Sequence, residues 1–198
     1  PTADHPSEGT FVHQSVESLR QAGLEVDVLA FRGSGSILSY FKAGKELRKK
    51  VKGGHYDLVH AHYGLTGLPA RMQFQIPVVL TYHGSDLLGE VGPGGKYTFS
   101  GRLKVWLGQI MGLLVNQRTV VAPVLKDVLW HSQGDVIPMG IDLETFYPKP
   151  MAEVRGKLGL DLNRKYILFL ASPENPVKRF DVASEAVDIL RQSRDDVE

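Results

Sequence analysis

The chain has 198 residues, of which 42% are hydrophobic and 23% charged, a composition typical of a globular protein. The formal net charge is +1 and there are no cysteines. The small charge gives no electrostatic case for a nucleic-acid partner, and the missing cysteines exclude disulfides and thiolate chemistry. No apolar run approaches the roughly 18 residues that a membrane-spanning helix needs.

In chain order, apolar periodicity and turn signals predict helices that alternate with strands. A first helix begins near Thr10 as its N-cap and ends before Gly23. The remaining helices are expected at residues 37–51, 65–74, 103–115, 124–130, 152–158 and 182–192. Strands are expected at residues 24–31, 57–61, 78–82, 119–123, 135–138 and 166–171. Residues 87–100, rich in glycine, are expected to form a loop.

This alternation predicts an α/β protein with a mainly parallel sheet covered by helices. No strand-like segment precedes the first helix, and only one strand follows the proline-rich linker 146–150. One βα unit cannot bury a core alone. We therefore expect a piece of a longer protein, with residues 1–148 forming one domain and residues 149–198 the linker and start of a second.

Histidines end two of the predicted strands. His60 and His62 stand in the first, two positions apart, and therefore point to one face of an extended strand. The second strand runs directly into His83, followed by Gly84, Ser85 and Asp86. Because ligands of open α/β sheets bind outside the carboxyl ends of the strands, these side chains predict one polar cleft.

The residues alone leave several roles open for this group. His60, His62 and His83 could line a substrate cleft, satisfy backbone groups, or hold a metal ion in a metal-dependent hydrolase, with Asp86 completing the ligands. Asp86 could also orient His83, bind substrate hydroxyls, or cap the following turn. An imidazole suits a substrate site because it both donates and accepts hydrogen bonds.

Several segments together resemble the group 1 (family 4) retaining glycosyltransferases of GT-B architecture. They are Gly9 to Val12, residues 56–62, residues 77–86, and residues 136–142 followed by Phe146 and Pro148, with a weaker likeness at residues 167–170 and 178–181. Their order and spacing are more specific than any one of them.

The resemblance implies two Rossmann-like domains that face each other across a cleft. The first, residues 1–148 without its first strand, would bind the acceptor, and the truncated second would begin the donor domain. Such enzymes transfer a sugar from a nucleotide diphosphate sugar with retention, usually without a bound metal or other cofactor. By this resemblance, His83 and Asp86 would take part in catalysis, and Gly9, Thr10, His60, His62 and Tyr63 would line the acceptor side of the cleft.

Lys178 and Arg179 would bind the donor phosphates. The chain departs from the family pattern at Met139, where asparagine is common, at Ser172, where an arginine contacts the diphosphate, and at Arg179, where glycine is usual. The family's pair of glutamates would lie beyond Glu198, so the fragment alone is expected to be inactive. The missing arginine also leaves a non-catalytic α/β binding module as an alternative.

The expected partners are a nucleotide-sugar donor and a glycan, lipid-linked or small-molecule acceptor. The helix expected at 103–115 is apolar on most of its circumference, which indicates either a buried helix or contact with a membrane surface or partner. The basic residues 45–52 could complement a helix dipole or dock on anionic lipid. A cytoplasmic location, with peripheral contact to the inner membrane face as an option, fits the missing cysteines.

Overall fold

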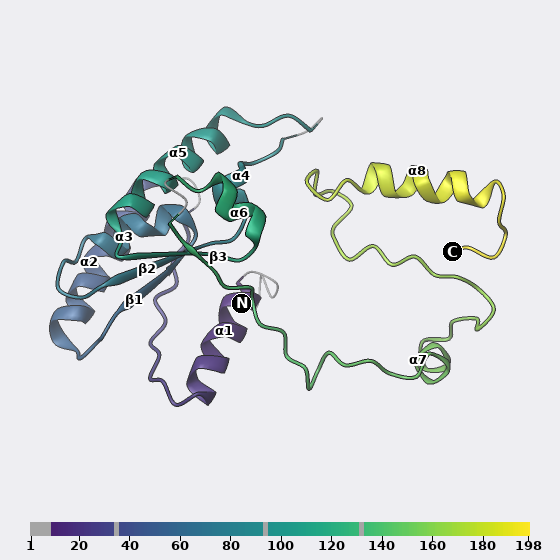
Figure 1. The fold of residues 1–198 in the computed structure, drawn as a ribbon, viewed down its shortest axis with the longest axis horizontal. Helices are drawn as coiled ribbons and strands as arrows, with labels where there is room; N and C mark the ends of the chain where they lie inside the picture. Colours follow the sequence, from purple (N-terminus) through teal and green to yellow (C-terminus); the bar gives the residue numbers. More distant parts are fainter. Residues whose placement is uncertain (1–8, 34–35, 93–94, 131–132) are drawn as a thin grey trace. The chain divides into compact units, whose positions relative to one another are not determined.

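The computed structural model describes residues 9–33, 36–92, 95–130 and 133–198. The chain forms two compact units (Figure 1). The first comprises Pro1–Glu90 and Tyr97–Gly140, and the second comprises Val91–Lys96 and Ile141–Glu198. The predicted site around the histidines lies entirely in the first unit.

The first unit is built on a parallel sheet of four strands in the order β1-β2-β3-β4. The strands are β1 (Val59–His62), β2 (Val78–Tyr82), β3 (Gln117–Val120) and β4 (Asp135–Val136). Each pairs in parallel with its neighbour in sequence order. The predicted α/β fold class and parallel sheet are confirmed, with bounds that differ from the predicted ones by up to three residues except in β2.

Helices connect the strands in the order that the sequence predicts. They are α1 (Thr10–Gln21), α2 (Ile37–Gly53), the 3₁₀ turn η1 (Gly64–Thr66), α3 (Gly67–Arg71), α4 (Ser85–Leu88), α5 (Phe99–Leu114) and α6 (Pro123–Val128). The short α4 was not predicted as a helix, and its last two residues fall in the predicted loop 87–100. It begins directly after β2 and therefore shapes the edge of the sheet where the histidines lie.

One face of the sheet carries the core. Val78, Leu80 and Tyr82 alternate along β2 and are fully buried under α3 and α5. The Tyr82 hydroxyl donates a hydrogen bond to the Gly108 carbonyl of α5, 2.8 Å away. A Cβ added at Gly112 would lie within 2.2 Å of the same hydroxyl. Glycine on α5 thus lets the helix approach the sheet closely.

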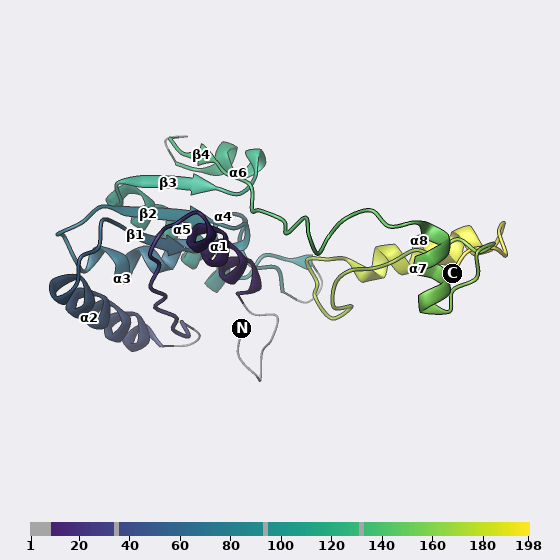
Figure 2. The ribbon, with the colours of Figure 1, turned by 90° about the horizontal axis from the view of Figure 1, so that it is seen from below.

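The opposite face of the sheet is polar. His60, His62, Thr81 and Thr119 point to it, and the register pairs His62 with Thr81 and Thr81 with Thr119. Figures 1 and 2 show α1 on this side of the sheet and α5 on the other. The half-buried strand β1 therefore presents apolar Val59 and Ala61 to the core and its two histidines to the polar face.

The strand predicted at residues 24–31 does not form. Its alternating pattern is real, but within the described residues no strand lies beside it to complete a hydrogen-bonded ladder. Leu24 and Val28 are each more than half exposed. The segment is held instead by side chains, because the Tyr56 hydroxyl donates to Asp27 at 2.5 Å and Arg20 donates to the Val26 carbonyl.

The second unit contains the helices α7 (Met151–Leu158) and α8 (Phe180–Arg191). The strand predicted at residues 166–171 is wrong: only an isolated bridge joins Lys165 to Val197. Leu168 and Leu170 are 77% and 88% exposed, and Phe169 packs on Phe180 of α8. An apolar strand needs a neighbouring strand, and the described part of this unit offers none.

The helix α5 is not the fully buried helix that was one of its two interpretations. Phe99, Leu103, Trp106 and Leu114 remain exposed along it, while Gly101, Gln109 and Gly112 are buried. Among the helices that the structure describes, none combines the length and the apolar character required to cross a bilayer.

Candidate functional site

The register of β1 and β2 brings two histidines together at the carboxyl edge of the sheet. His62 is the last residue of β1 and pairs with Thr81, while His83 follows β2 directly. His62 Nδ1 lies 3.0 Å from His83 Nε2 in a hydrogen bond. The predicted convergence of these two side chains is thus present in the structure.

Aromatic rings hold His83 from two further elements. The ring of Phe11, from the first turn of α1, has its centroid 4.6 Å from that of His83. The ring of Tyr63, which follows β1, lies 4.9 Å from His83 and 6.0 Å from Phe11. The first turn of α1 therefore borders the histidines.

Gly9 and Thr10 stand at the start of that helix. Gly9, with φ +70°, is the N-cap, and Thr10 is the first helical residue; the expectation that Thr10 is the N-cap is wrong by one position. A φ of this sign favours glycine, which explains why glycine precedes the helix. Both residues directly precede Phe11, whose ring contacts that of His83.

His60 belongs to the same group but bonds elsewhere. Its ring stacks on that of His62 with centroids 4.3 Å apart. Its Nε2 lies 2.7 Å from Thr81 Oγ1, which in turn lies 2.5 Å from Thr119 Oγ1. One nitrogen of each histidine ring is thus bonded to another histidine or to a threonine.

That arrangement bears on the metal-dependent hydrolase. In the part of the chain that the structure describes, no group of three His, Cys, Asp or Glu side chains is arranged to hold a metal ion. His62 Nδ1 and His83 Nε2 bond each other, and a metal would have to break that hydrogen bond. The hydrolase alternative is not favoured.

Burial keeps the histidines neutral. It lowers the pKa of His62 to about 3, assisted by the charges of His60 and His83, and lowers that of His83 to about 4, assisted by the charge of His60. Burial also lowers the pKa of His60. At neutral pH the group can therefore donate and accept hydrogen bonds without carrying charge.

Asp86 binds backbone amides. Its Oδ1 accepts from the amides of His83 (3.0 Å) and Gly84 (2.8 Å), and its Oδ2 accepts from the Gly64 amide (3.1 Å). Burial raises the pKa of Asp86, while these three N–H donors act in the opposite direction. Of the roles left open by the sequence, the geometry supports capping the turn, and it also links the ends of β1 and β2.

The turn after β1 is strained. Tyr63 has φ +72°, a region that residues with a Cβ rarely adopt. The next residue, Gly64, lies against α5, where a Cβ would be 3.0 Å from Gly108 Cα and from Tyr82 Cε1. The Asp86 carboxylate that accepts the Gly64 amide fixes this turn and, with it, the Tyr63 ring beside His83.

Gly64→Ala is expected to lower the free energy of unfolding of the first unit by about 1–3 kcal/mol, since the new methyl meets backbone and a buried ring. Gly53→Ala, at the end of α2 with nothing within 4 Å of the added Cβ, is the control and should be neutral or stabilising by up to about 1 kcal/mol. Denaturant unfolding measures both. Equal stability of the two variants would show that η1 moves away from α5 freely.

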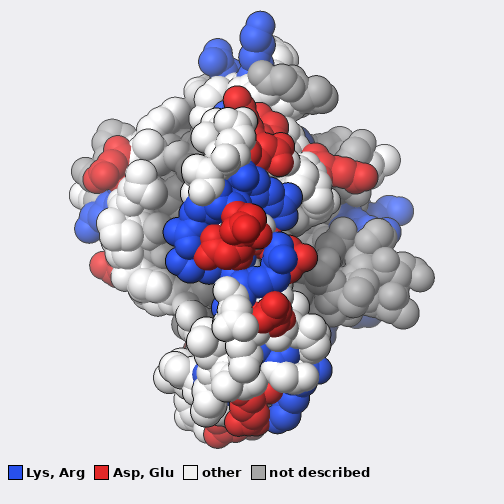
Figure 3. All heavy atoms as spheres, turned by 90° about the vertical axis from the view of Figure 1, so that its right-hand side faces the viewer, with Lys and Arg blue, Asp and Glu red and all other residues white. Residues whose placement is uncertain are grey.

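Lys178 and Arg179 lie in the second unit, just before α8. Arg179 has φ +53°, a backbone conformation that favours glycine. This agrees with the glycine that is usual at this position in the family that the sequence resembles. Its guanidinium donates two parallel hydrogen bonds to the Asp181 carboxylate, from Nε to Oδ1 at 2.9 Å and from Nη2 to Oδ2 at 2.8 Å. On the face shown in Figure 3, basic side chains surround acidic ones, so neither sign forms an extended patch there.

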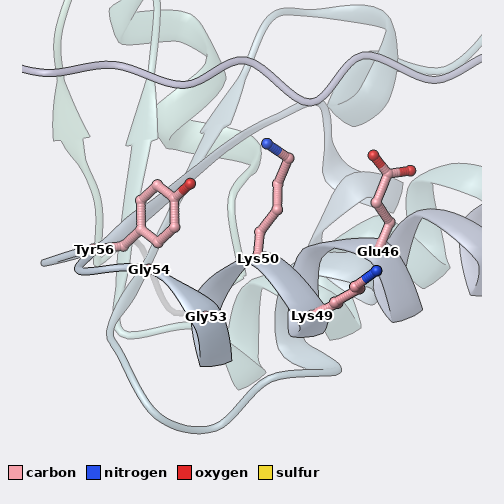
Figure 4. A pocket seen from close by; sticks show the side chains of 6 residues that line it. All are labelled: Glu46, Lys49, Lys50, Gly53, Gly54 and Tyr56. Carbon is pink, nitrogen blue, oxygen red and sulfur yellow. The ribbon is translucent and has the colours of Figure 1, made fainter.

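A separate hollow lies where α2 ends and the chain turns toward the start of β1. Its lining residues are Glu46, Lys49, Lys50, Gly53, Gly54 and Tyr56 (Figure 4). Lys50 and Tyr56 both contact the carboxylate of Asp27. Because Tyr56 precedes β1, this hollow lies at the amino end of the strand, whereas the histidines lie at its carboxyl end.

Sequence reasoning did not find Phe11 or the threonine pair Thr81 and Thr119 as parts of the site. Thr81 carries a weak signal, because it interrupts an otherwise apolar run immediately before the histidine. Phe11 belongs to a segment that carries the family resemblance, but its contact with His83 depends on how α1 packs on the polar face and has no signal of its own in the sequence.

Comparison with known proteins connects this geometry to a family. The sequence model of Glycosyltransferase Family 4 matches residues 34–145. The chain is 26% identical over 208 residues to the D-inositol 3-phosphate glycosyltransferase of Pseudarthrobacter chlorophenolicus, covering 100% of the chain and 48% of the relative. It is 30% identical over 146 residues to the enzyme of that name from Mycobacterium ulcerans, covering 68% and 31%.

A solved structure agrees with the fold. Sucrose-phosphate synthase (tll1590) from Thermosynechococcus elongatus superposes with a TM-score of 0.55 at 21% identity, covering 81% of this chain and 49% of that one. At this identity the likeness concerns the fold alone, which is that of a GT-B enzyme. The chain spans about half the length of the curated relatives that it matches. Since the family match covers more than half of its residues, the chain belongs to Glycosyltransferase Family 4.

Proposed function

We propose that the full-length protein transfers a sugar from a nucleotide diphosphate sugar to an acceptor, with retention at the anomeric carbon. In this proposal the first unit binds the acceptor and His83 contacts the transferred sugar. The observation that carries it is the meeting of His62, His83, Phe11 and Tyr63 at the carboxyl edge of a parallel sheet. That edge is where α/β folds bind ligands.

The electrostatics favour substrate binding over acid catalysis as the role of His83. Burial lowers the pKa of His83 to about 4, so the imidazole is neutral at physiological pH. It then lacks the second ring proton that an acid catalyst would donate. It can hydrogen-bond a sugar hydroxyl and thereby orient the anomeric carbon, which is a contribution through positioning. Asp86 supports the same site by holding the backbone on either side of it.

On the donor side, we assign the phosphates to Lys178, with Arg179 as a second cation. The Arg179 guanidinium is already bonded to Asp181, so it would have to exchange that partner for a phosphate oxygen, which it can also bind in a fork. The transfer is proposed to need no bound metal or other cofactor. Dialysis against a chelator should then leave turnover unchanged.

Among acceptors, D-inositol 3-phosphate is the first to test, because it appears in the name of the relatives that match the chain. Glycans and lipid-linked acceptors form the other arms of the test. The exposed apolar residues of α5 support peripheral membrane contact as part of the proposal, at the cytoplasmic face of the membrane.

The test is sugar transfer by the full-length protein with UDP, GDP and ADP sugars, each with and without acceptor. His83→Ala is expected to lower kcat/KM by about 10- to 100-fold, the worth of one hydrogen bond to the substrate. His55→Ala, an exposed histidine in the turn before β1, is the matched control. Unchanged turnover in His83→Ala would remove His83 from the site, and an inverted anomeric product would refute retention.

A further inference from the structure

The helix α5 has its small residues on the inside and its large apolar residues on the outside. The residues buried against the rest of the unit are Gly101, Gly108, Gln109 and Gly112. The exposed ones recur at the three- and four-residue spacing of a single helix face. They are Phe99, Leu103, Trp106, Leu113 and Leu114. Most of the apolar bulk of this helix therefore does not serve the core of the unit.

The first half of α5 lies at the carboxyl edge of the sheet. Gly108, in the middle of the helix, packs against Gly64, which follows β1: a Cβ added at Gly108 would lie 3.3 Å from Gly64 Cα. Because α5 leads back to the start of β3, the residues before Gly108 extend away from the strands. At 1.5 Å per residue, Phe99 lies roughly 13 Å further along the helix axis. The short α4, which follows β2, packs beside α5 (Figure 1).

The charges of α5 favour an anionic partner. The helix contains Arg102 and Lys104 and no aspartate or glutamate. Lys104 is paired with Glu90 at 2.9 Å, whereas Arg102 is exposed and forms no ion pair within the part of the chain that the structure describes. The first turn also lacks an acidic residue, so the positive end of the helix dipole is not compensated there. An apolar face with uncompensated positive charge beside it is the result.

These charges distinguish two occupants of the face. A second copy of the chain would bring another Arg102 and no carboxylate from its own α5. An anionic bilayer offers hydrocarbon to the apolar side chains and negative headgroups to the cations, and the interface is a favoured place for tryptophan. Helix α2, which lies one helix away because α3 contacts both, adds attraction through exposed cations at positions 42, 45, 48, 49 and 52.

We propose that the outward face of the first half of α5, formed by Phe99, Leu103 and Trp106 with Arg102 beside them, docks on an anionic lipid bilayer. Docking would place the sheet edge that carries His62 and His83 close to the headgroups. The inference deepens the membrane contact of the proposed function and rests on it for the acceptor, which would be lipid-linked. The docking itself can be measured without sugar transfer.

The experiment is co-sedimentation of the full-length protein with vesicles. One set contains phosphatidylcholine alone, and the other contains phosphatidylcholine mixed with phosphatidylglycerol. The wild type is expected to bind the mixed vesicles more tightly. Phe99→Ser and Trp106→Ser should each lower the partition coefficient about tenfold, through the loss of buried apolar area. Arg102→Gln should lower it about fivefold on the mixed vesicles and leave it unchanged on phosphatidylcholine.

The chain offers a matched control for the aromatic substitutions. Phe74, in the turn before β2, is 79% exposed, compared with 84% for Phe99, but it lies at the amino end of the strands. Phe74→Ser should bind both kinds of vesicle as the wild type does. All of these side chains are exposed, and unfolding curves that match the wild type would show that the variants remain folded.

Several results would overturn the proposal. It fails if Phe99→Ser and Trp106→Ser bind as the wild type does, if the wild type shows no preference for the mixed vesicles, or if it binds neither kind. It also fails if the protein binds no vesicles and forms a dimer that dissociates in Trp106→Ser, because the face would then belong to a second copy. If binding depends on α5 as expected but no donor and acceptor give transfer, the proposed function fails and the docking stands.

Discussion

Asp86→Ala is expected to lower the free energy of unfolding of the first unit by about 3 kcal/mol. The substitution leaves three backbone N–H groups, those of Gly64, His83 and Gly84, without the acceptor that they share. A buried donor without a partner costs about 1–3 kcal/mol, and partial access of water to this edge reduces the sum. Denaturant unfolding of the 198-residue chain measures the loss.

The chain offers a convenient probe and a matched control. Its two tryptophans, Trp106 and Trp130, both belong to the first unit, so their fluorescence follows the unfolding of that unit. Asp27→Ala removes an exposed carboxylate that contacts the side chains of Lys50 and Tyr56. That change should lower the stability far less than Asp86→Ala, because exposed pairs contribute little.

A second variant isolates the link between the two strand ends. Asp86→Asn can keep one oxygen toward the His83 and Gly84 amides, but it must turn its own N–H₂ toward the Gly64 amide. Two donors then face each other, and we expect a loss of about 1–2 kcal/mol, smaller than for alanine. If both variants retain full stability and lose transfer activity, the carboxylate acts on the substrate and the capping role is secondary.

The parts of the fold that the sequence predicts are those where local pattern and long-range pairing agree. Strand β2 is a short apolar run bounded by Pro77 and Gly84, and its bounds are as predicted. Residues 24–31 and 166–171 carry equally clear strand patterns, yet neither has a neighbouring strand among the residues that the structure describes. The local sequence pattern shows that a segment could form a strand. Whether a neighbouring strand is available to pair with it depends on the whole unit.

The features of the site also divide into those that the sequence predicts and those that it does not. That His62 and His83 meet follows from two strands ending at one edge of a parallel sheet, so it could be predicted. That their rings bond each other, and that Asp86 binds amides instead of His83's ring, depends on the turn geometry at Tyr63 and Gly84. Those backbone angles, φ +72° and φ +135°, have no signal in the sequence beyond one glycine.

Acidification is expected to destabilise the first unit through His62 and His83. Their pKa values in the folded chain, about 3 and about 4, lie below the value of about 6.5 of a histidine in an unfolded chain. Between pH 6.5 and 4, the unfolded state therefore binds protons that the folded state does not. The stability is complete above pH 6.5 and is lost as the pH falls toward the folded values.

The size of this loss is set by how far water screens the rings. Each histidine can contribute at most about 1.4 kcal/mol per pH unit below 6.5. Because both rings are only half-buried, we expect about 2 kcal/mol for the pair between pH 6.5 and 4.5. Asp86 acts with the opposite sign, because burial raises its pKa and the folded state takes up its proton first.

A comparison of variants separates these contributions. The double variant with His62→Asn and His83→Asn keeps Asp86 and every other acidic group, but it removes the two titrating rings. Its free energy of unfolding should fall less between pH 6.5 and 4.5 than that of the wild type, by about 2 kcal/mol. His55→Asn, exposed at the far end of β1, should show the wild-type profile. Parallel profiles for wild type and double variant would mean that the rings accept protons while folded, and the neutral hydrogen bond between them would have to be abandoned.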